Sequence, residues 1–316
     1  MKRSVIRGCY IFLGTEEEYI LKPLGSILKL NWRTTTVNRF IAKPLLLASL
    51  SFMNLLYQPL AFADRGPHHH QATMKQSTTL QLAIEKIINQ DGKRRVFIKL
   101  TEKKDNKPVN LADLKEVHTQ KFHLLVIDDS LSDYSHVHPI KTKKPGIYQF
   151  TWQPNKKEAT YRLWADLVPT NTNQQEYVIA DLMVIKKPAT LIDRIPSMEK
   201  TVDGFTFKLS FDQKQLTAKK ATMGKIEITD AAGKPVKTLE PVMGAYAHIV
   251  GFSDDFKTVV HIHPMGIEPT KASNRGGPEL QFHIEPEKAG FIKLFAQVKI
   301  KGKELFVPFG LMVQNA

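Results

Sequence analysis

Short apolar segments alternate with polar turns along most of the chain. The segments VFIKL (96–100), FHLLVI (122–127) and YRLWADL (161–167) are rich in β-branched and aromatic residues. Turn sequences such as DGK, KPG and KGK separate segments of this kind. Short strands at such spacing are typical of an all-β sandwich or barrel. The segment QLAIEKIIN (81–89) fits either a short helix or a first strand.

An internal repeat divides this β-rich region into two. Residues 116–139 and 241–264 align without gaps at an offset of 241 − 116 = 125 residues. The aligned pairs are His123 with His248, His136 with His261, His138 with His263, and Pro139 with Pro264. Further along, YRLWADL matches IKLFAQV (292–298). The pattern predicts an all-β fold of two tandem immunoglobulin-like β-sandwich domains, at residues 76–187 and 198–315, with a linker over 188–197.

The N-terminal region has the pattern of an export signal. Residues 37–63 combine Arg39 and Lys43 with an apolar stretch and end in Ala-Phe-Ala. This pattern predicts a signal peptide cleaved after Ala63, and a periplasmic or secreted mature protein. An uncleaved anchor is the alternative, but the apolar run is shorter than the roughly 20 residues that a membrane span needs. Residues 1–36 are interpreted as an extension from an upstream start codon, and residues 64–75 as a histidine-containing disordered segment.

Composition excludes several classes of function. The chain has 45 Lys and Arg against 31 Asp and Glu, a net charge of +14. These basic residues alternate with apolar ones instead of clustering, so no nucleic-acid partner is expected. The single cysteine, Cys9, allows no disulfide framework. Catalytic motifs such as Gly-x-Ser-x-Gly, a metalloprotease helix or a phosphate loop are missing, so the chain is not expected to be an enzyme.

The repeated histidines have the spacing of a metal site. Side chains at i and i+2 of a strand share one face, as do His136 and His138. If residues 128–133 form a hairpin loop, His123 lies opposite His138 and the three imidazoles converge. The same register brings together His248, His261 and His263. The sequence therefore predicts one metal site in each repeat, with imidazoles that face outward from the sheet.

Further side chains bear on the identity of the metal. His118 and Met243 each stand five residues before the first histidine of their set, and His283 follows later in the second repeat. We treat these three as optional additional ligands. Imidazole and thioether ligands together favour copper, with zinc as the alternative. The tract 68–70 is interpreted either as a loose metal-capturing arm or as a solvated tail.

The segments HLLVIDDSLSDYSHVHP (123–139) and GAYAHIVGFSDDFKTVVHIHP (244–264) resemble a family of exported bacterial immunoglobulin-like proteins associated with the handling of copper and other heavy metals. The resemblance covers most of residues 90–315. It implies a metal-binding role for the six repeated histidines. The first repeat departs from the pattern because it lacks the Gly-Ala-Tyr of residues 244–246.

Two functional hypotheses follow. The first is a periplasmic or secreted metal-binding protein that acts in copper storage, delivery or resistance, with an acceptor protein in the periplasm or at the outer surface as a partner. The alternative is an adhesion or assembly module whose histidine face is sensitive to pH rather than to metal. A membrane span is not expected in the mature protein.

Overall fold

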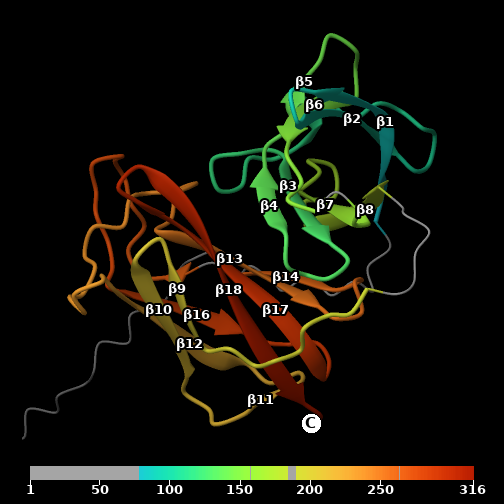
Figure 1. Ribbon diagram of the computed structural model, residues 1–316. Helices are drawn as coiled ribbons and strands as arrows, with labels where there is room; N and C mark the ends of the chain where they lie inside the picture. Colours follow the sequence, from blue (N-terminus) through green and yellow to red (C-terminus); the bar gives the residue numbers. More distant parts are fainter. Residues whose placement is uncertain (1–77, 157, 184–189, 263) are drawn as a thin grey trace, which may run out of the picture. The chain divides into compact units, whose positions relative to one another are not determined.

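The computed structural model describes residues 78–156, 158–183, 190–262 and 264–316, and these ranges form two β-sandwiches (Figure 1). Their helical content is a single 3-10 turn, η1 (Leu111–Asp113). None of their helices is long and apolar enough to cross a membrane. The prediction of an all-β protein with two tandem sandwiches is confirmed. The predicted segments 1–36, 37–63 and 64–75 lie outside the described residues.

The first sandwich consists of two four-stranded sheets. One sheet has the order β1-β2-β6-β5, with β1 (Leu80–Gln90), β2 (Lys93–Glu102), β6 (Ile147–Trp152) and β5 (Ile140–Lys141). The other has the order β4-β3-β7-β8, with β4 (Tyr134–Val137), β3 (His123–Asp128), β7 (Tyr161–Leu167) and β8 (Glu176–Met183). Apolar side chains from both sheets form its core. The segment 81–89 is therefore a strand.

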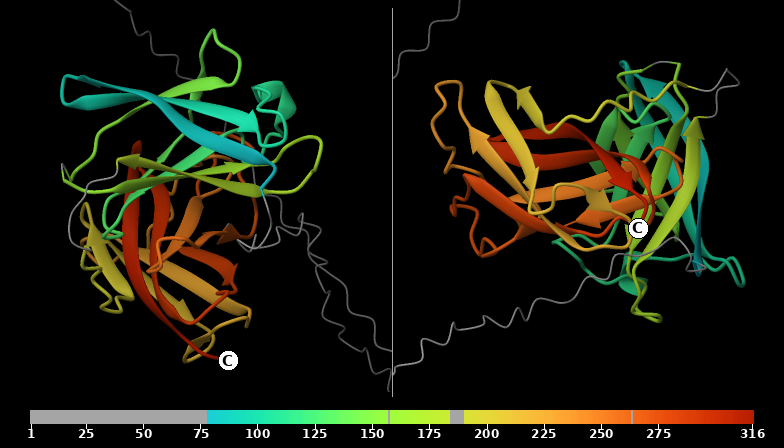
Figure 2. Two further views of the ribbon diagram at one scale, coloured as in Figure 1. Left: turned by 90° about the vertical axis from the view of Figure 1, so that its right-hand side faces the viewer. Right: turned by 90° about the horizontal axis from the view of Figure 1, so that it is seen from below.

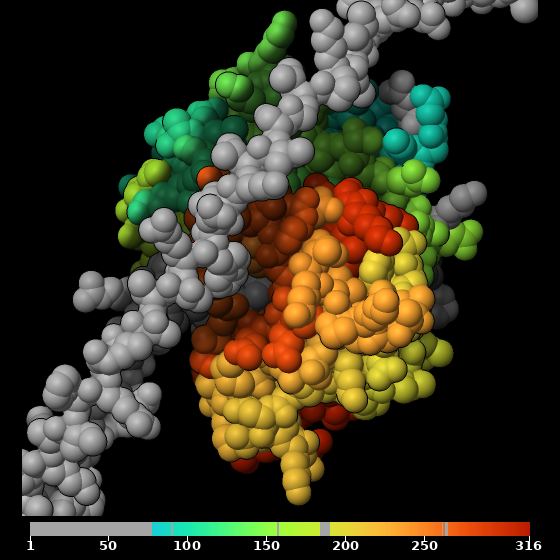
Figure 3. Space-filling view, turned by 90° about the vertical axis from the view of Figure 1, so that its left-hand side faces the viewer, coloured from blue at the N-terminus to red at the C-terminus, as the bar shows by residue number. Residues whose placement is uncertain are grey.

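The second sandwich repeats this plan with two five-stranded sheets. One has the order β15-β16-β12-β10-β9, with β15 (Pro264–Met265), β16 (Glu279–Ile284), β12 (Thr222–Thr229), β10 (Phe205–Phe211) and β9 (Glu199–Val202). The other has the order β11-β18-β17-β13-β14, with β11 (Leu216–Thr217), β18 (Lys303–Gln314), β17 (Gly290–Ile300), β13 (Ala247–Ser253) and β14 (Val259–Ile262). Figure 2 shows the two layers, and Figure 3 shows yellow and orange segments of this sandwich at its surface.

Strands β3 and β13 are buried on both faces, which explains why their sequences read as continuous apolar runs. Leu124 of β3 points into the core of the first sandwich. Its neighbour Leu125 belongs to a separate apolar cluster, which also contains Val250 and Phe252 of β13. The sheets that carry the repeated histidines therefore pack against one another, and side chains on the outer faces of β3 and β13 are enclosed.

The His-x-His-Pro motif marks the point where an edge strand changes sheet. In the first repeat, β4 pairs with β3 in one sheet, and β5 pairs with β6 in the other, with His138 and Pro139 between them. Strands β14 and β15 make the same change in the second repeat. Proline suits this corner because it has no amide hydrogen to contribute to a ladder that ends there.

Candidate metal centre

The hairpin register that the sequence predicts is present in both repeats. Ile127 of β3 pairs with Tyr134 of β4, and Leu124 pairs with Val137. The next step of this register places His123 opposite His138. In the second repeat, Phe252 pairs with Val259 at the equivalent positions. A slip of one residue would have sent each first histidine to the opposite face.

Three imidazoles of the first repeat converge on one point. Nδ1 of His123 lies 3.1 Å from Nε2 of His136 and 3.2 Å from Nε2 of His138. One nitrogen of each ring lies within 4.8 Å of the other two. Two nitrogens that each lie about 2 Å from one tetrahedral ion are about 3.3 Å apart. The arrangement therefore has the dimensions of three ligands around a single ion.

The centre is enclosed between the two sandwiches. His123 is 2% exposed and His136 is 9% exposed, while His138 is half-buried. These imidazoles point away from the core of their own sandwich, but the expectation that they lie at the protein surface is wrong, because the second sandwich covers the sheet that carries them. Burial, and then the neighbouring His123, lower the pKa of His138 to about 4. His138 is therefore neutral at neutral pH, as a metal ligand must be.

Hydrogen bonds on the outer side of the rings fix their tautomers. Nε2 of His123 lies 2.8 Å from the carbonyl oxygen of Val117, and Nδ1 of His136 lies 3.0 Å from Oε1 of Gln297. The amide of Gln297 is itself oriented, because its Nε2 donates to the carboxylate of Glu304 at 2.8 Å. Both partner oxygens only accept, so in neutral imidazoles these two ring nitrogens carry the hydrogen.

The lone pairs of His123 and His136 consequently point at one another. Nδ1 of His123 and Nε2 of His136 are both acceptors in these tautomers and lie 3.1 Å apart. Two facing lone pairs at this distance are unfavourable unless a cation lies between them. Metal-binding histidines typically donate their other nitrogen to a carbonyl or carboxylate, as both rings do here. The arrangement has the donor set and outer partners of a metal centre.

His118 and Met243 occupy the same position in two equivalent tight turns. Backbone hydrogen bonds join Val117 with Gln120 in one turn and Val242 with Ala245 in the other. His118 has φ of 50° and Met243 has φ of 49°. The ring of His118 lies beside two others, with centroid separations of 6.3 Å from His123 and 5.5 Å from His248.

The remaining predicted ligands all belong to the second repeat. His248 is 1% exposed and its ring centroid lies 6.2 Å from that of His136. Imidazoles of the two repeats therefore adjoin, and a separate second site formed by His248, His261 and His263 stays a prediction. The backbone of His261 pairs with Val250 in β14. His263 lies outside the described residues. His283 is exposed on β16, in the opposite sheet of its sandwich, and is not brought to these rings.

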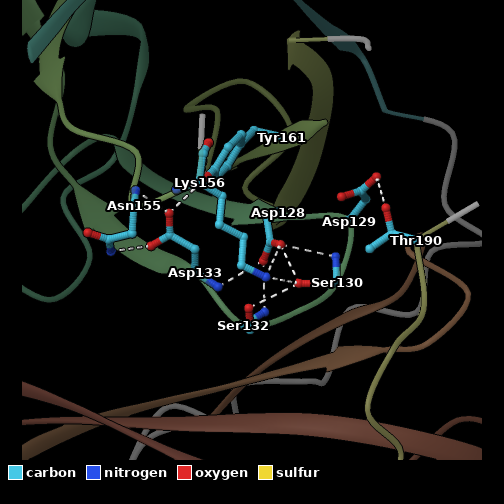
Figure 4. A network of polar contacts seen from close by, with 9 residues as sticks. All are labelled: Asp128, Asp129, Ser130, Ser132, Asp133, Asn155, Lys156, Tyr161 and Thr190. Atoms are coloured by element: carbon cyan, nitrogen blue, oxygen red, sulfur yellow. Dashed lines mark hydrogen bonds and ion pairs between the residues drawn. The ribbon is translucent and has the colours of Figure 1, made fainter. Parts of the chain in front are cut away.

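A polar network closes the β3–β4 hairpin that carries the centre (Figure 4). The buried carboxylate of Asp128 accepts from the amides of Ser132 and Asp133, each at 2.8 Å, and from Ser130. Lys156 lies 3.1 Å from the same carboxylate. Burial alone would raise the pKa of Asp128, but these hydrogen bonds outweigh it and lower the pKa. The loop thereby fixes the register of the histidines.

The repeated motif does not reveal the supporting roles of Gln297 and Glu304. A signal for the first is visible in retrospect, because Gln297 is a polar residue inside the apolar strand FIKLFAQVKI and is only 3% exposed. A buried side-chain amide requires a hydrogen-bond partner. Which partner it has depends on how the two sandwiches pack, and the sequence pattern does not contain that information.

Fold and site together define a protein of two tandem β-sandwiches with a buried histidine centre at their junction. The chain belongs to the family described as "Domain of unknown function (DUF8832)", whose profile matches residues 73–181 and 200–315. No curated protein matches the chain.

Two solved structures illustrate the structural similarities. One is "Escherichia coli alpha-2-macroglobulin activated by porcine elastase", at 14% identity and a TM-score of 0.21; the alignment covers 75% of this chain and 20% of that one. The other is "Chimeric titin Z1Z2-Z1Z2 tandem (Z1212) functionalized with a GRGDS exogenous peptide from fibronectin", at 10% identity and a TM-score of 0.15, covering 70% of this chain and 91% of that one. Neither similarity carries a functional argument.

Proposed function

We propose that this protein binds a late first-row transition metal ion, copper in the first place, through Nδ1 of His123 and Nε2 of His136 and His138. The observation that carries the proposal is the 3.1 Å separation between Nδ1 of His123 and Nε2 of His136, two nitrogens that both carry lone pairs in the tautomers favoured by the acceptor oxygens of Val117 and Gln297. An ion between them replaces a repulsion with two bonds. Imidazole ligands suit copper and zinc alike.

In the proposed role the ion is cargo. The three ligands come from one rigid hairpin and its outer partners come from both sandwiches, so the centre is suited to holding an ion tightly. We propose storage, delivery or resistance as the physiological setting, in the periplasm or outside the cell, with an acceptor protein as partner. No enzymatic step is part of the proposal.

Burial also bears on the alternative role in adhesion. A pH-sensitive contact with another protein needs histidines at the surface. His123 and His136 are enclosed, so they cannot form such a contact face directly. The metal-binding proposal accounts for their enclosure, whereas the adhesion hypothesis does not.

Competition titration of the full chain tests the proposal. Cu(I), Cu(II) and Zn(II) would be titrated against chromophoric chelators, with residues 68–70 replaced by alanine to remove binding by that tract. We expect affinity well beyond micromolar for at least one ion. A matched variant with His123, His136 and His138 replaced by asparagine should lose that binding. Affinity weaker than micromolar in the parent protein, or equal affinity in both, would contradict the proposal.

A further inference from the structure

The two equivalent turns before the histidine strands meet at the junction of the sandwiches. A β-carbon placed on Gly244 of the second turn would lie 3.5 Å from Cγ2 of Thr119 in the first turn. Glycine has no β-carbon, so this distance measures how closely the two turns approach one another. His118 and Met243 each precede these two residues in sequence and hold the same left-handed backbone conformation. This close approach of the turns brings two potential ligand-bearing positions from different repeats near one another.

His118 reaches the first histidine of the other repeat. Its ring centroid lies 5.5 Å from that of His248, with the rings inclined at 73°. The rings of the main centre have similar separations, 5.3 Å for His123 and His136 and 5.0 Å for His136 and His138. The pair formed by His118 and His248 thus has the ring spacing of two ligands that share an ion.

The tautomer of His248 is set in the same way as that of its repeat partner. Nε2 of His248 lies 3.3 Å from the carbonyl oxygen of Met243, as Nε2 of His123 lies 2.8 Å from that of Val117. A carbonyl oxygen only accepts, so the lone pair of each neutral ring is on Nδ1. This is the nitrogen with which His123 faces the main centre.

We propose that His118 and His248 hold a second metal ion, a monovalent copper, beside the ion of the main centre. The proposal deepens the proposed function and rests on it for the kind of cargo. The second position adjoins the first, because His248 lies 6.2 Å from His136 and His118 lies 6.3 Å from His123, measured between ring centroids.

The chemistry of the position favours Cu(I). A low-dielectric interface strengthens repulsion between neighbouring cations, so a monovalent ion costs less there than a second divalent one. Cu(I) also accepts low coordination numbers and soft ligands, and the thioether-bearing Met243 belongs to the adjoining turn. Each repeat therefore contributes one imidazole to this shared position.

His118→Asn is the decisive variant. Asparagine tolerates the left-handed conformation of this turn, so the backbone should keep its shape. The full chain with residues 68–70 replaced by alanine would be titrated anaerobically with Cu(I) and, separately, with Zn(II). We expect two tightly bound Cu(I) ions in the parent protein and one in the variant, with one Zn(II) in both. His283→Asn, in an exposed position on β16, is the matched control and should retain two Cu(I).

The outcomes separate this proposal from the proposed function. One Cu(I) in both parent and variant would overturn the second position and leave the main centre standing. Two Cu(I) in both would also overturn it, because the second ion would then lie elsewhere. No tight binding in the parent protein would refute the main centre itself. A thermal melt of the variant confirms that it is folded.

Discussion

The two histidine-bearing hairpins share their register but differ in what supports them. In the first, buried Asp128 organises the loop, and in the second Ser253 takes that position while Asp255 accepts from the amides of Lys257 and Thr258. Nε2 of the first histidine lies 2.8 Å from the carbonyl oxygen of Val117 in the first repeat and 3.3 Å from that of Met243 in the second. The two repeats therefore share the backbone arrangement of the hairpin, whereas the residues around their histidines differ.

A second difference concerns Asp166 and Gln297, which are equivalent when YRLWADL is aligned with IKLFAQV. Asp166 accepts from Gln175, a residue of its own sandwich. Gln297 instead reaches across the junction to His136. The centre in the first repeat is therefore completed by the second repeat. We infer that neither repeat would bind metal alone as tightly as the pair does.

The largest expected effect tests whether the two sandwiches depend on one another. Trp164 is fully buried in the apolar cluster between them, with its ring centroid 5.4 Å from that of Phe252. Replacing Trp164 by alanine should lower the free energy of unfolding by about 3–5 kcal/mol, because it removes a large buried side chain. Chemical denaturation measures this change. Leu191→Ala, at a position 91% exposed, is the control. A loss below about 1 kcal/mol in the Trp164 variant would mean that the sandwiches are independent.

Removing a ligand should weaken metal binding more than removing any outer partner. Replacing His123 by asparagine takes away the nitrogen that faces both other rings. We expect a fall in affinity of more than about 100-fold, above the range for outer-shell partners. Competition titration gives the value, and His283→Asn should change it less than twofold. If both variants bind equally, the ion is not held by the first repeat.

The variant Gln297→Leu tests how much the second sandwich contributes to metal affinity. Leucine cannot accept from Nδ1 of His136, so the ring is free to rotate or change tautomer. Loss of an outer partner of a metal-binding histidine typically costs about 10–100-fold in affinity. Gln281→Leu, on the exposed face of β16, is the matched control. Unchanged affinity in the Gln297 variant would show that the first repeat needs no help from the second.

The two hairpin loops can be compared directly through Asp128→Asn and Asp255→Asn. The carboxylate of Asp128 is fully buried, whereas the side chain of Asp255 is 26% exposed. We expect a loss of about 1–2 kcal/mol in unfolding free energy for the first and less than about 1 kcal/mol for the second, because unsatisfied buried donors cost more. Urea denaturation at neutral pH distinguishes them. Equal losses would mean that burial does not separate the loops.

The carboxylate of Asp128 also predicts that the free energy of unfolding depends on pH. Although burial opposes it, hydrogen bonding lowers the pKa of Asp128 below its ordinary value in the folded state. A lowered folded-state pKa gives stability that is complete above the unfolded value of about 3.9 and is lost as pH falls through the folded pKa. Unfolding free energies measured between about pH 5 and pH 2 should therefore decline less steeply in Asp128→Asn than in the parent protein. Parallel curves would count against the carboxylate's role.

Much of this architecture could be predicted from the sequence. The offset of 125 residues and the loop 128–133 predict the pairing of Ile127 with Tyr134, which the structure confirms. The spacing of residues along the sequence was sufficient to predict this pairing, because strand geometry dictates which side chains share a face. The enclosure of His123 and the bond from His136 to Gln297 could not be predicted. Both depend on packing between sheets that are distant in sequence, and periodicity within a strand does not specify the opposing surface.

The atoms that bind the ion provide the most direct test of the central claim. Long-range proton–nitrogen NMR of imidazole-labelled protein distinguishes Nδ1 from Nε2 in each ring, with and without Cu(I) or Zn(II), which are both diamagnetic. We expect hydrogen on Nε2 of His123 and on Nδ1 of His136, and metal-induced shifts of Nδ1 of His123 and Nε2 of His136. Spectra of these rings that do not change on addition of either metal, or ligation through the opposite nitrogens, would contradict the account.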